Sequence, residues 1–340
     1  MGLSALAARE SAAGQLARRA RVAGDSRSRP TRGVSRPTTP MMDILGLGAT
    51  AVDHLIYVPS YPPPNVKSHV QRSERQCGGL TATALVAASR LGARCAYAGM
   101  LGRDDASQFV AETLQREGID LSHLIVRDDA GPIRSTIIVG TDRGTRNVFP
   151  EHPAQCGAHP TLPPEPVIRN ARVLFVDHVG IEGMIRAARV ARAAGIPIVS
   201  DIERDLPGCR ELLELVDHVV MSWDFARALT GAHSPEEGIY RLWTPRRALV
   251  AVTCGEDGCF FSDDGQVVSH QPAFRVQVAD TTGCGDVFHG AYCAALAKGM
   301  PAAERIRLAS AAAALKATRT GGQAGAPTLE QTLRFLGAQN

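Results

Sequence analysis

The stretch Val278-Ala-Asp-Thr-Thr-Gly-Cys-Gly-Asp-Val287 is the most informative part of this chain, because it joins extended sequence to a helical run over residues 287–298. Glycine lets a backbone approach another group closely, and the first amides of a helix have no acceptor within the helix. The helix dipole adds partial positive charge at the same end. We therefore expect the amides of residues 283–286 to form an anion-binding site at the start of this helix.

Asp286 lies at the same predicted helix end, where a negative charge is favoured. A carboxylate there can accept the proton of a substrate hydroxyl, and a positioned base of this kind contributes about 10²–10⁴-fold to a rate. The partial positive charge beside it suits a phosphoryl group in transfer. The alternative is that the aspartate and the glycines only cap a helix, and their spacing alone leaves both interpretations open.

From residue 43 onward, strand-like and helix-like stretches alternate. Helical spacing is found over residues 80–91 and 106–117, and the alanine-rich segment 287–336 is mostly helical. The predicted strands of the main sheet are residues 44–47, 94–100, 173–176, 196–200, 216–221 and 247–253. This alternation predicts one large α/β domain with a doubly wound, mostly parallel sheet and helices on both faces.

Two regions break the alternation. Residues 133–139 and 146–149 flank the turn-like Thr141-Asp-Arg-Gly144, which predicts a β-hairpin. Residues 55–58, the proline-rich stretch that follows them and the strand-like residues 68–72 read as further extended chain. We expect a small β lid beside the main sheet, built from about residues 55–75 and 132–150.

The run Gly46-Leu-Gly48-Ala-Thr-Ala51 matches the dinucleotide-binding pattern G-x-G-x-x-A. That pattern binds a pyrophosphate only where a helix opens at the glycines. Here a second extended run follows, with no room for the helix, so the context excludes NAD binding. We interpret the glycines as closely packed backbone beside a ligand, with Asp53 as a hydrogen-bonding partner.

Three further stretches suit a nucleotide and a polar substrate. Thr253 and Gly255 end a predicted strand and could meet nucleotide phosphates. Cys77-Gly-Gly79 precedes a helix whose first turn carries Thr81 and Thr83. Residues 314–325 read as a helix that runs into a glycine-rich loop, which could enclose an adenine.

Composition and charge narrow the class of protein. The 340 residues are 44% hydrophobic and 21% charged, which is ordinary for a globular protein, and no run is apolar enough for a membrane span. Residues 1–40 carry eight arginines against two acidic residues, so the rest of the chain is net acidic although the whole carries +3. This argues against a nucleic-acid partner. The eight cysteines include no C-x-x-C pair, which favours reduced thiols and a cytoplasmic location.

The first residues form a separate segment. Residues 1–41 are rich in Ala, Arg, Ser and Pro and contain no apolar pattern, whereas Met41 and Met42 directly precede the first predicted strand. We expect residues 1–41 to be an extension that is either disordered or the product of a start set too early, with an organelle-targeting leader as a further alternative. The folded domain is then residues 42–338.

Four motifs in this order make the chain resemble the ribokinase-like (PfkB) family of carbohydrate kinases. They are the glycine pair and helix of residues 78–92, Gly102-Arg-Asp-Asp105, Val252-Thr-Cys-Gly-Glu-Asp-Gly258, and the D-T-x-G-x-G-D motif of residues 280–286. The resemblance covers about residues 43–336. It implies a doubly wound sheet with a β lid, ATP with Mg²⁺ as cofactors, and transfer of the γ-phosphoryl group to a hydroxyl of a sugar.

The same resemblance assigns roles to residues of this chain. It implies that Asp286 is the general base and that Gly283, Cys284 and Gly285 form the anion hole. Asp53, Gly78 and Gly79 would contact the sugar, and the residues expected to bind ATP are Thr253, Gly255, Gly258, Thr282 and Gly322. Related kinases bind K⁺ at the positions that correspond to Asp280, Thr282 and the loop 319–325 of this chain. The ligands there are mostly backbone carbonyls, so the sequence neither supports nor excludes a K⁺ site.

Departures from the family obscure the substrate. Thr83 stands where many members have an asparagine that holds sugar hydroxyls, and Ser222-Trp-Asp-Phe225 stands in place of N-x-x-E, which leaves Asp224 as a substitute. These variants look similar to the 6-deoxy-6-sulfofructose kinases. In such an enzyme Lys67 could contact an anionic sugar, but Pro150 and Val179 occupy positions where polar side chains that bind the sulfonate are expected.

The remaining alternatives are a nucleoside kinase and, outside the enzymes, a nucleotide- or sugar-binding regulator that kept the fold. We expect a small-molecule sugar as substrate, no nucleic-acid or membrane partner, and a homodimer formed through the β lid, where Ile137 and Val139 would offer exposed apolar surface.

Overall fold

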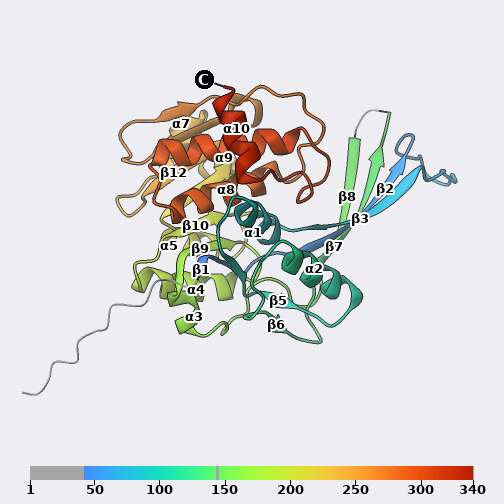
Figure 1. Cartoon of the computed structure of the whole chain (residues 1–340), viewed down its shortest axis with the longest axis horizontal. Helices are drawn as coiled ribbons and strands as arrows, with labels where there is room; N and C mark the ends of the chain where they lie inside the picture. The colour runs from blue at the N-terminus through green and yellow to red at the C-terminus, as the bar shows by residue number, and fades with distance from the viewer. Residues whose placement is uncertain (1–41, 143–144, 340) are drawn as a thin grey trace, which may run out of the picture. The chain divides into compact units, whose positions relative to one another are not determined.

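A computed structural model of the chain describes residues 42–142 and 145–339 (Figure 1). The expected extension over residues 1–41 lies outside the described residues. None of the helices in the described part has the length and apolar character that a bilayer span requires. All eight cysteines are free thiols, as their spacing predicted.

Within the described residues, the main sheet has eight strands in the order β14-β13-β12-β11-β10-β9-β1-β4. The strands from β12 to β4 run parallel, and β13 and β14 form an antiparallel edge. Their bounds are β1 Met42–Gly46, β4 Cys95–Tyr97, β9 Ala171–Asp177, β10 Ile198–Asp201, β11 His218–Ser222, β12 Leu249–Thr253, β13 Cys259–Ser262 and β14 Ser269–Gln271. The predicted parallel sheet is confirmed, whereas the edge strands β13 and β14 were not anticipated; both are short, and β14 has no apolar residue.

Two layers of helices cover the two faces of this sheet (Figure 1). Along β9, Val173 and Phe175 join one core while Leu174 and Val176 join the other, because successive side chains point to opposite faces. The first core receives α1 Leu80–Arg90, α2 Asp105–Arg116, α8 Cys284–Ala297 and α9 Ala302–Ala317. The second receives α3 Glu165–Arg169, α4 Ile181–Ala193, α5 Cys209–Leu215, α6 Trp223–Thr230 and α7 Pro235–Leu242. The remaining helical elements are η1 Gly255–Asp257 and α10 Leu329–Gly337.

A second sheet, here called the flap sheet, projects from the body in Figure 1. It pairs its strands in the order β3-β2-β7-β8, with β2 and β7 parallel. The bounds are β2 Ala51–Val58, β3 Arg72–Gly78, β7 Ile133–Gly140 and β8 Thr145–Glu151. The predicted hairpin is therefore confirmed as β7 and β8.

Two strand predictions were wrong. The strand expected at residues 68–72 is displaced to β3, because β3 pairs with β2 from Tyr57 back toward Ala51 and β2 ends at Val58. Residues 68–70 therefore have no strand to pair with. The run expected over residues 94–100 is divided between β4, which joins the main sheet, and β5 Met100–Leu101, which pairs with β6 Ile125–Val126.

Helices α1 and α8 cross at a close backbone contact. A Cβ on Gly290 of α8 would lie 2.1 Å from the carbonyl oxygen of Ala84 in α1, so only glycine permits this approach. The contact fixes the helix after the glycine pair against the helix after the D-T-x-G-x-G-D motif. Two sequence motifs far apart in the chain are thereby brought together.

Candidate active site

The motif of residues 280–286 forms the turn that begins α8. Gly283 precedes the helix in the left-handed region, with φ 77°, which glycine adopts without strain. A Cβ on Gly283 would lie 2.9 Å from the Cα of Gly322 and 3.5 Å from the methyl group of Thr83. The start of α8, the glycine-rich loop and α1 therefore meet at this glycine.

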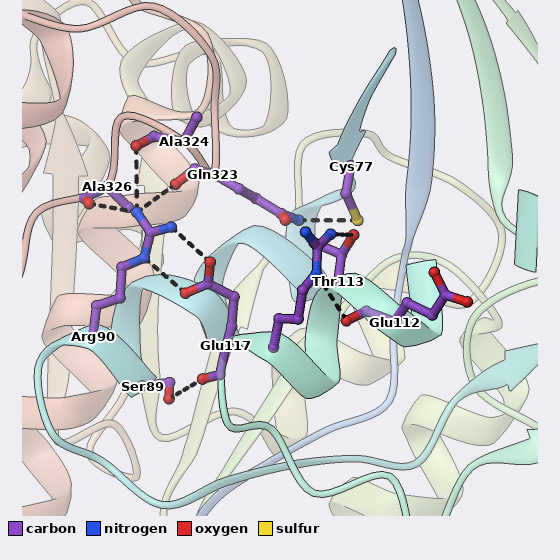
Figure 2. Close-up of polar contacts among 10 residues, drawn as sticks. Cys77, Ser89, Arg90, Glu112, Thr113, Glu117, Gln323, Ala324 and Ala326 are labelled. Atoms are coloured by element: carbon purple, nitrogen blue, oxygen red, sulfur yellow. Dashed lines mark hydrogen bonds and ion pairs between the residues drawn. The ribbon is translucent and has the colours of Figure 1, made fainter. Parts of the chain in front are cut away.

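The glycine-rich loop is held by a partly buried network that Figure 2 shows. The Arg90 guanidinium, at the end of α1, donates to the carbonyls of Gln323 at 2.8 Å and Ala326 at 2.7 Å. The same guanidinium binds both carboxylate oxygens of Glu117 at 2.7 and 2.8 Å, a bidentate geometry that fixes its plane. Gln323 in turn donates to the Sγ of Cys77 at 3.4 Å. The loop is thus bound to α1, α2 and the flap sheet.

Asp280 connects that loop to the motif. Its Oδ1 accepts from the Thr282 amide at 2.9 Å and its Oδ2 from the Gly321 amide at 2.8 Å. The Nζ of Lys316 lies 3.5 Å from Oδ2. Although burial opposes the change, these amides and the ammonium lower the pKa of Asp280, so the carboxylate is ionised.

The amides at the start of α8 are the expected anion donors. The Cys284 amide points to the carbonyl of Thr281 at 3.2 Å, so one of the expected donors is already engaged. Gly285 is exposed, and nothing lies within 4 Å of the position that its Cβ would take, so the space beside this residue is open, while its carbonyl faces the His289 ring. Burial raises the pKa of the Cys284 thiol, so its side chain offers no thiolate.

Asp286 is half-buried in the first turn of α8. Desolvation raises the pKa of its carboxyl well above the usual range, and the negative charges of Asp201, Glu203 and Asp177 act in the same direction. Asp177 and Asp201 end the neighbouring strands β9 and β10 and are register partners. The carboxyl ends of parallel strands are where ligands bind in such sheets.

His289 is a packed helix residue rather than a second base. It is 4% exposed, and its ring nitrogens lie 2.8 Å from the Gly285 carbonyl and 3.1 Å from the Val220 carbonyl. Its Nδ1 also lies 3.4 Å from the Oδ2 of Asp201. Both ring nitrogens therefore face groups of the protein, and the buried ring is not available to a substrate.

The residues expected to contact the sugar fall into two groups. Asp53 is partly buried on β2, and a Cβ on Gly78 would lie 2.6 Å from its Oδ2, so Asp53 and Gly78 are in direct contact. Burial raises the pKa of Asp53, and a hydrogen bond with Ser135 opposes this change. Thr83 is 1% exposed, and Lys67 is an exposed loop residue with no ion-pair partner among the described residues.

Close packing limits the space around two of the predicted glycines, Gly79 of the sugar group and Gly258 of the ATP group. A Cβ on Gly79 would lie 2.6 Å from the Ala49 carbonyl, and one on Gly258 would lie 2.2 Å from the Gln271 carbonyl. Gly255, by contrast, has nothing within 4 Å of its Cβ position. Thr253 is half-buried at the end of β12, and its hydroxyl donates to the Met221 carbonyl at 3.4 Å. A Cβ on Gly322 would meet only ordinary contacts at 3.9 Å, so Gly255 and Gly322 are the glycines of this set with space beside them.

The G-x-G-x-x-A run is followed by a strand, which agrees with the exclusion of NAD binding. Its glycines are closely packed backbone, as expected. A Cβ on Gly48 would lie 2.0 Å from the Oδ2 of Asp177, which accepts from the Ala49 amide at 2.6 Å and from the Thr81 hydroxyl at 2.7 Å. The run therefore packs around a buried carboxylate.

Comparison with known proteins identifies the family of this chain. The sequence profile of the pfkB family carbohydrate kinases matches residues 41–329. The chain belongs to this family.

The similarity extends to whole relatives of the pfkB family. Ribokinase of Haemophilus influenzae is 29% identical over 303 residues, which cover 85% of this chain and 97% of that protein. Aminoimidazole riboside kinase of Salmonella typhimurium is 29% identical over 297 residues, covering 79% and 91%. The crystal structure of a putative ribokinase from Agrobacterium tumefaciens superposes with a TM-score of 0.81 at 30% identity, covering 88% and 98%.

Four residues near the pfkB motif were not singled out from the sequence. Asp177 and Asp201 each follow a buried strand directly, a position that could have identified them. The Arg146 guanidinium of β8 donates to the hydroxyl of Thr282, and Lys316 binds Asp280, but both contacts join segments that the sequence pattern does not connect. Asp224, considered as a substitute for the missing N-x-x-E glutamate, is 90% exposed and pairs with Arg227.

A hollow of about 660 Å³ lies on the other face of the flap sheet and is distinct from this site. His54, Arg75 and Arg134 line it, and the two arginines pair with Asp105 and Asp104 of the α2 start. Asp53, next to His54, points to the opposite face because strand side chains alternate.

The charges around Asp286 predict a pH effect. A base must be ionised to accept a proton, so kcat/KM falls as the pH decreases through the raised pKa of Asp286. Substitution Glu203→Gln removes a repelling charge, lowers that pKa and shifts the acid limb of the pH profile to lower pH. The neighbouring Asp205, which pairs with Arg210, provides the control Asp205→Asn, whose profile should match the parent. An unshifted limb in Glu203→Gln would contradict the assignment.

Proposed function

We propose that the chain transfers the γ-phosphoryl group of ATP to a hydroxyl of a sugar or riboside. Asp286 acts as general base, and the amides of residues 283–285 form the anion site. The observation that carries the proposal is the half-buried carboxylate in the first turn of α8, one residue beyond Gly285, which has open space beside it. The family membership supplies the reaction class, and the geometry supplies a base and an anion site within one helical turn.

The chemistry follows from this arrangement. As the acceptor oxygen attacks the γ-phosphorus, its proton passes to the carboxylate of Asp286, and the bond from the γ-phosphorus to the bridging oxygen of ATP breaks to release ADP. The helix dipole and the open amides stabilise the charge on the phosphoryl oxygens without rearrangement. The carboxylate itself is more basic because it is desolvated among other carboxylates, which suits a base that must take a proton from an alcohol.

Magnesium fits the residues present. The Oδ2 of Asp201 is buried and accepts no hydrogen bond within the described residues, although the Nδ1 of His289 lies 3.4 Å away. Among those residues no three-ligand metal group occurs, but Mg²⁺ usually takes only one or two carboxylates together with substrate phosphates. Asp201 would hold the ion, which supplies neutralisation of the phosphate charge when bound.

The acceptor that we propose contains a ribose-type sugar, since relatives named ribokinase and aminoimidazole riboside kinase share 85% and 79% of this chain, slightly more than the 76% shared by the fructokinases of Oryza sativa and Zea mays. Asp53 and the adjoining Gly78 backbone are the polar groups available to sugar hydroxyls. Thr83 is buried against Gly283, so it cannot replace the reach of an asparagine without a shift of α1.

The decisive experiment measures ADP release by the purified protein over ribose, fructose, ribosides and a 6-sulfonated ketose. We expect one class to be turned over, and Asp286→Asn to lower kcat by about 10²–10⁴-fold because the base is lost. The exposed Asp224 offers the matched control Asp224→Asn, which should retain activity. If no acceptor raises ADP release above that of Asp286→Asn, the chain is a binding regulator and the proposal fails.

We propose in addition that the flap sheet, residues 51–78 and 133–151, acts as a lid over this site. The guanidinium of Arg146 on β8 contacts the Thr282 hydroxyl and lies 3.6 Å from the Oδ1 of Asp280. An arginine at this place can reach phosphate oxygens bound at the start of α8.

Substitution Arg146→Gln tests the lid. We expect KM for ATP to rise about tenfold, the size of one charged hydrogen bond. Arg72 of β3 stacks on Tyr57 within the flap sheet, so Arg72→Gln is the matched control with unchanged KM. Equal kinetics for the two variants would remove the support for this lid contact.

The homodimer also stays a proposal. Ile137 does not supply the exposed surface expected of it, since it is 7% exposed, and Val148 and Phe149 on the edge strand β8 offer about half-exposed apolar surface instead. Sedimentation equilibrium should give twice the mass of the chain, and a monomer would contradict pairing at this edge.

A further inference from the structure

Lys316 is a buried cation beside the phosphoryl-transfer motif, and nothing in the proposed reaction uses it. It lies in the last turn of α9 and is 0% exposed. Its Nζ donates to the carbonyl of Asp280 at 2.7 Å and to the carbonyl of Arg319 at 3.2 Å, and it lies 3.5 Å from the Oδ2 of Asp280. A lysine is rarely buried so completely unless its charge is paired.

The oxygens around this ammonium are of the kind that bind an alkali cation. Backbone carbonyls in a fixed arrangement replace the hydration shell of K⁺ in proteins, and a carboxylate neutralises the charge. An ammonium group carries three donors, and three oxygens surround it here. Asp280 and the start of the loop 319–325 are the very groups that the family resemblance assigned to a monovalent cation.

These residues do not fit an additional potassium ion at that place. The ammonium already occupies the carbonyls of Asp280 and Arg319, and its charge is balanced by the Asp280 carboxylate. Gly325 closes the space from the other side, since a Cβ there would lie 3.1 Å from the Cε of Lys316 and 2.8 Å from the Gly321 carbonyl. A second cation would meet a like charge in a site without a free carboxylate.

We propose that the ammonium of Lys316 is a built-in monovalent cation, which makes the nucleotide site of this chain independent of K⁺. Lys316 acts as a positioning residue, because it binds the carbonyl of Asp280 while the amides of Ala279 and Asp280 donate to the Ala317 carbonyl at 2.8 and 3.1 Å. The turn that carries Thr282 and Gly283 is thereby fixed to the end of α9. The inference rests on the proposed function only in taking this turn as the place where nucleotide phosphates bind.

The test compares the parent protein with Lys316→Ala in potassium, sodium, ammonium and choline chloride at equal ionic strength. The readouts are the melting temperature and the affinity for ADP measured by calorimetry, neither of which needs the sugar. For the parent we expect the same values in all four salts. For Lys316→Ala we expect ADP affinity in choline to fall about tenfold or more, and to be restored by potassium or ammonium but not by choline.

The matched control is Lys298→Ala, which removes another lysine that donates to a carbonyl at a helix end, that of Leu91 at 2.9 Å. It should show no cation effect. A parent protein whose ADP affinity or melting temperature rises specifically with potassium overturns the proposal. So does a loss in Lys316→Ala that no cation restores, since the lysine would then be a packing element only.

Two measurements keep the test decisive if Lys316→Ala does not fold. Lys316→Met keeps the length of the side chain without its charge, and should lose ADP affinity in every salt because its methyl group blocks the cage. Titration of the parent with thallium(I), followed by thallium NMR, should show no bound ion, and a bound ion would overturn the proposal. Failure of the kinase proposal would appear as absent sugar turnover with these cation results unchanged.

Discussion

The carboxylate of Asp280 is the point on which the site depends. One oxygen holds the amide of Thr282 in its own turn, and the other holds the amide of Gly321 in the glycine-rich loop. These two bonds bring Gly283 so close to Gly322 that a Cβ on Gly283 would lie 2.9 Å from the Cα of Gly322. Both amides need an ionised acceptor to bind strongly, and Lys316 with Arg146 supplies the positive charge that keeps it ionised. The anion site at the start of α8 therefore exists only as far as Asp280 keeps its charge.

The other carboxylates near the start of α8 create a negative potential, which opposes the binding of phosphate groups. Asp177 and Asp201 lie side by side because β9 and β10 are parallel and in register, and both raise the pKa of Asp286. A cluster of negative charge beside a phosphate site would repel the nucleotide unless it were compensated. The amide hydrogen bonds to Asp177 neutralise part of this field from within the protein. A bound divalent cation would compensate the orphaned Asp201, and it would also bring the pKa of Asp286 back toward the value that a base at neutral pH requires.

Much of the fold and of the motif could be predicted because the signals are local. The helices at residues 80–91 and 106–117 and the turn at Gly283 depend on neighbouring residues, and they were found at the expected places. Lys316 and Arg146 could not be predicted, since they reach partners 36 and 136 residues away. Gly258 was predicted to contact the nucleotide, and that prediction stays open, but the close approach of Gln271 already excludes a side chain at this position. A glycine in a motif indicates that another group lies close to the backbone, but it does not indicate whether that group is a ligand or a part of the protein.

The choice of acceptor depends on a register that no motif describes. The flap sheet presents one face to the active site and the other to the hollow beside α2, and side chains alternate between them. Asp53 faces Gly78 only because β2 pairs Asp53 with Gln76 and Ser135; a slip of one residue would present His54 instead. Val52 is buried in the core that contains α1, so the same slip would remove it from that core, which favours the observed register. If Asp53 contacts the sugar as proposed, the acceptor site depends on packing below the flap sheet as well as on the polar residues of the sheet.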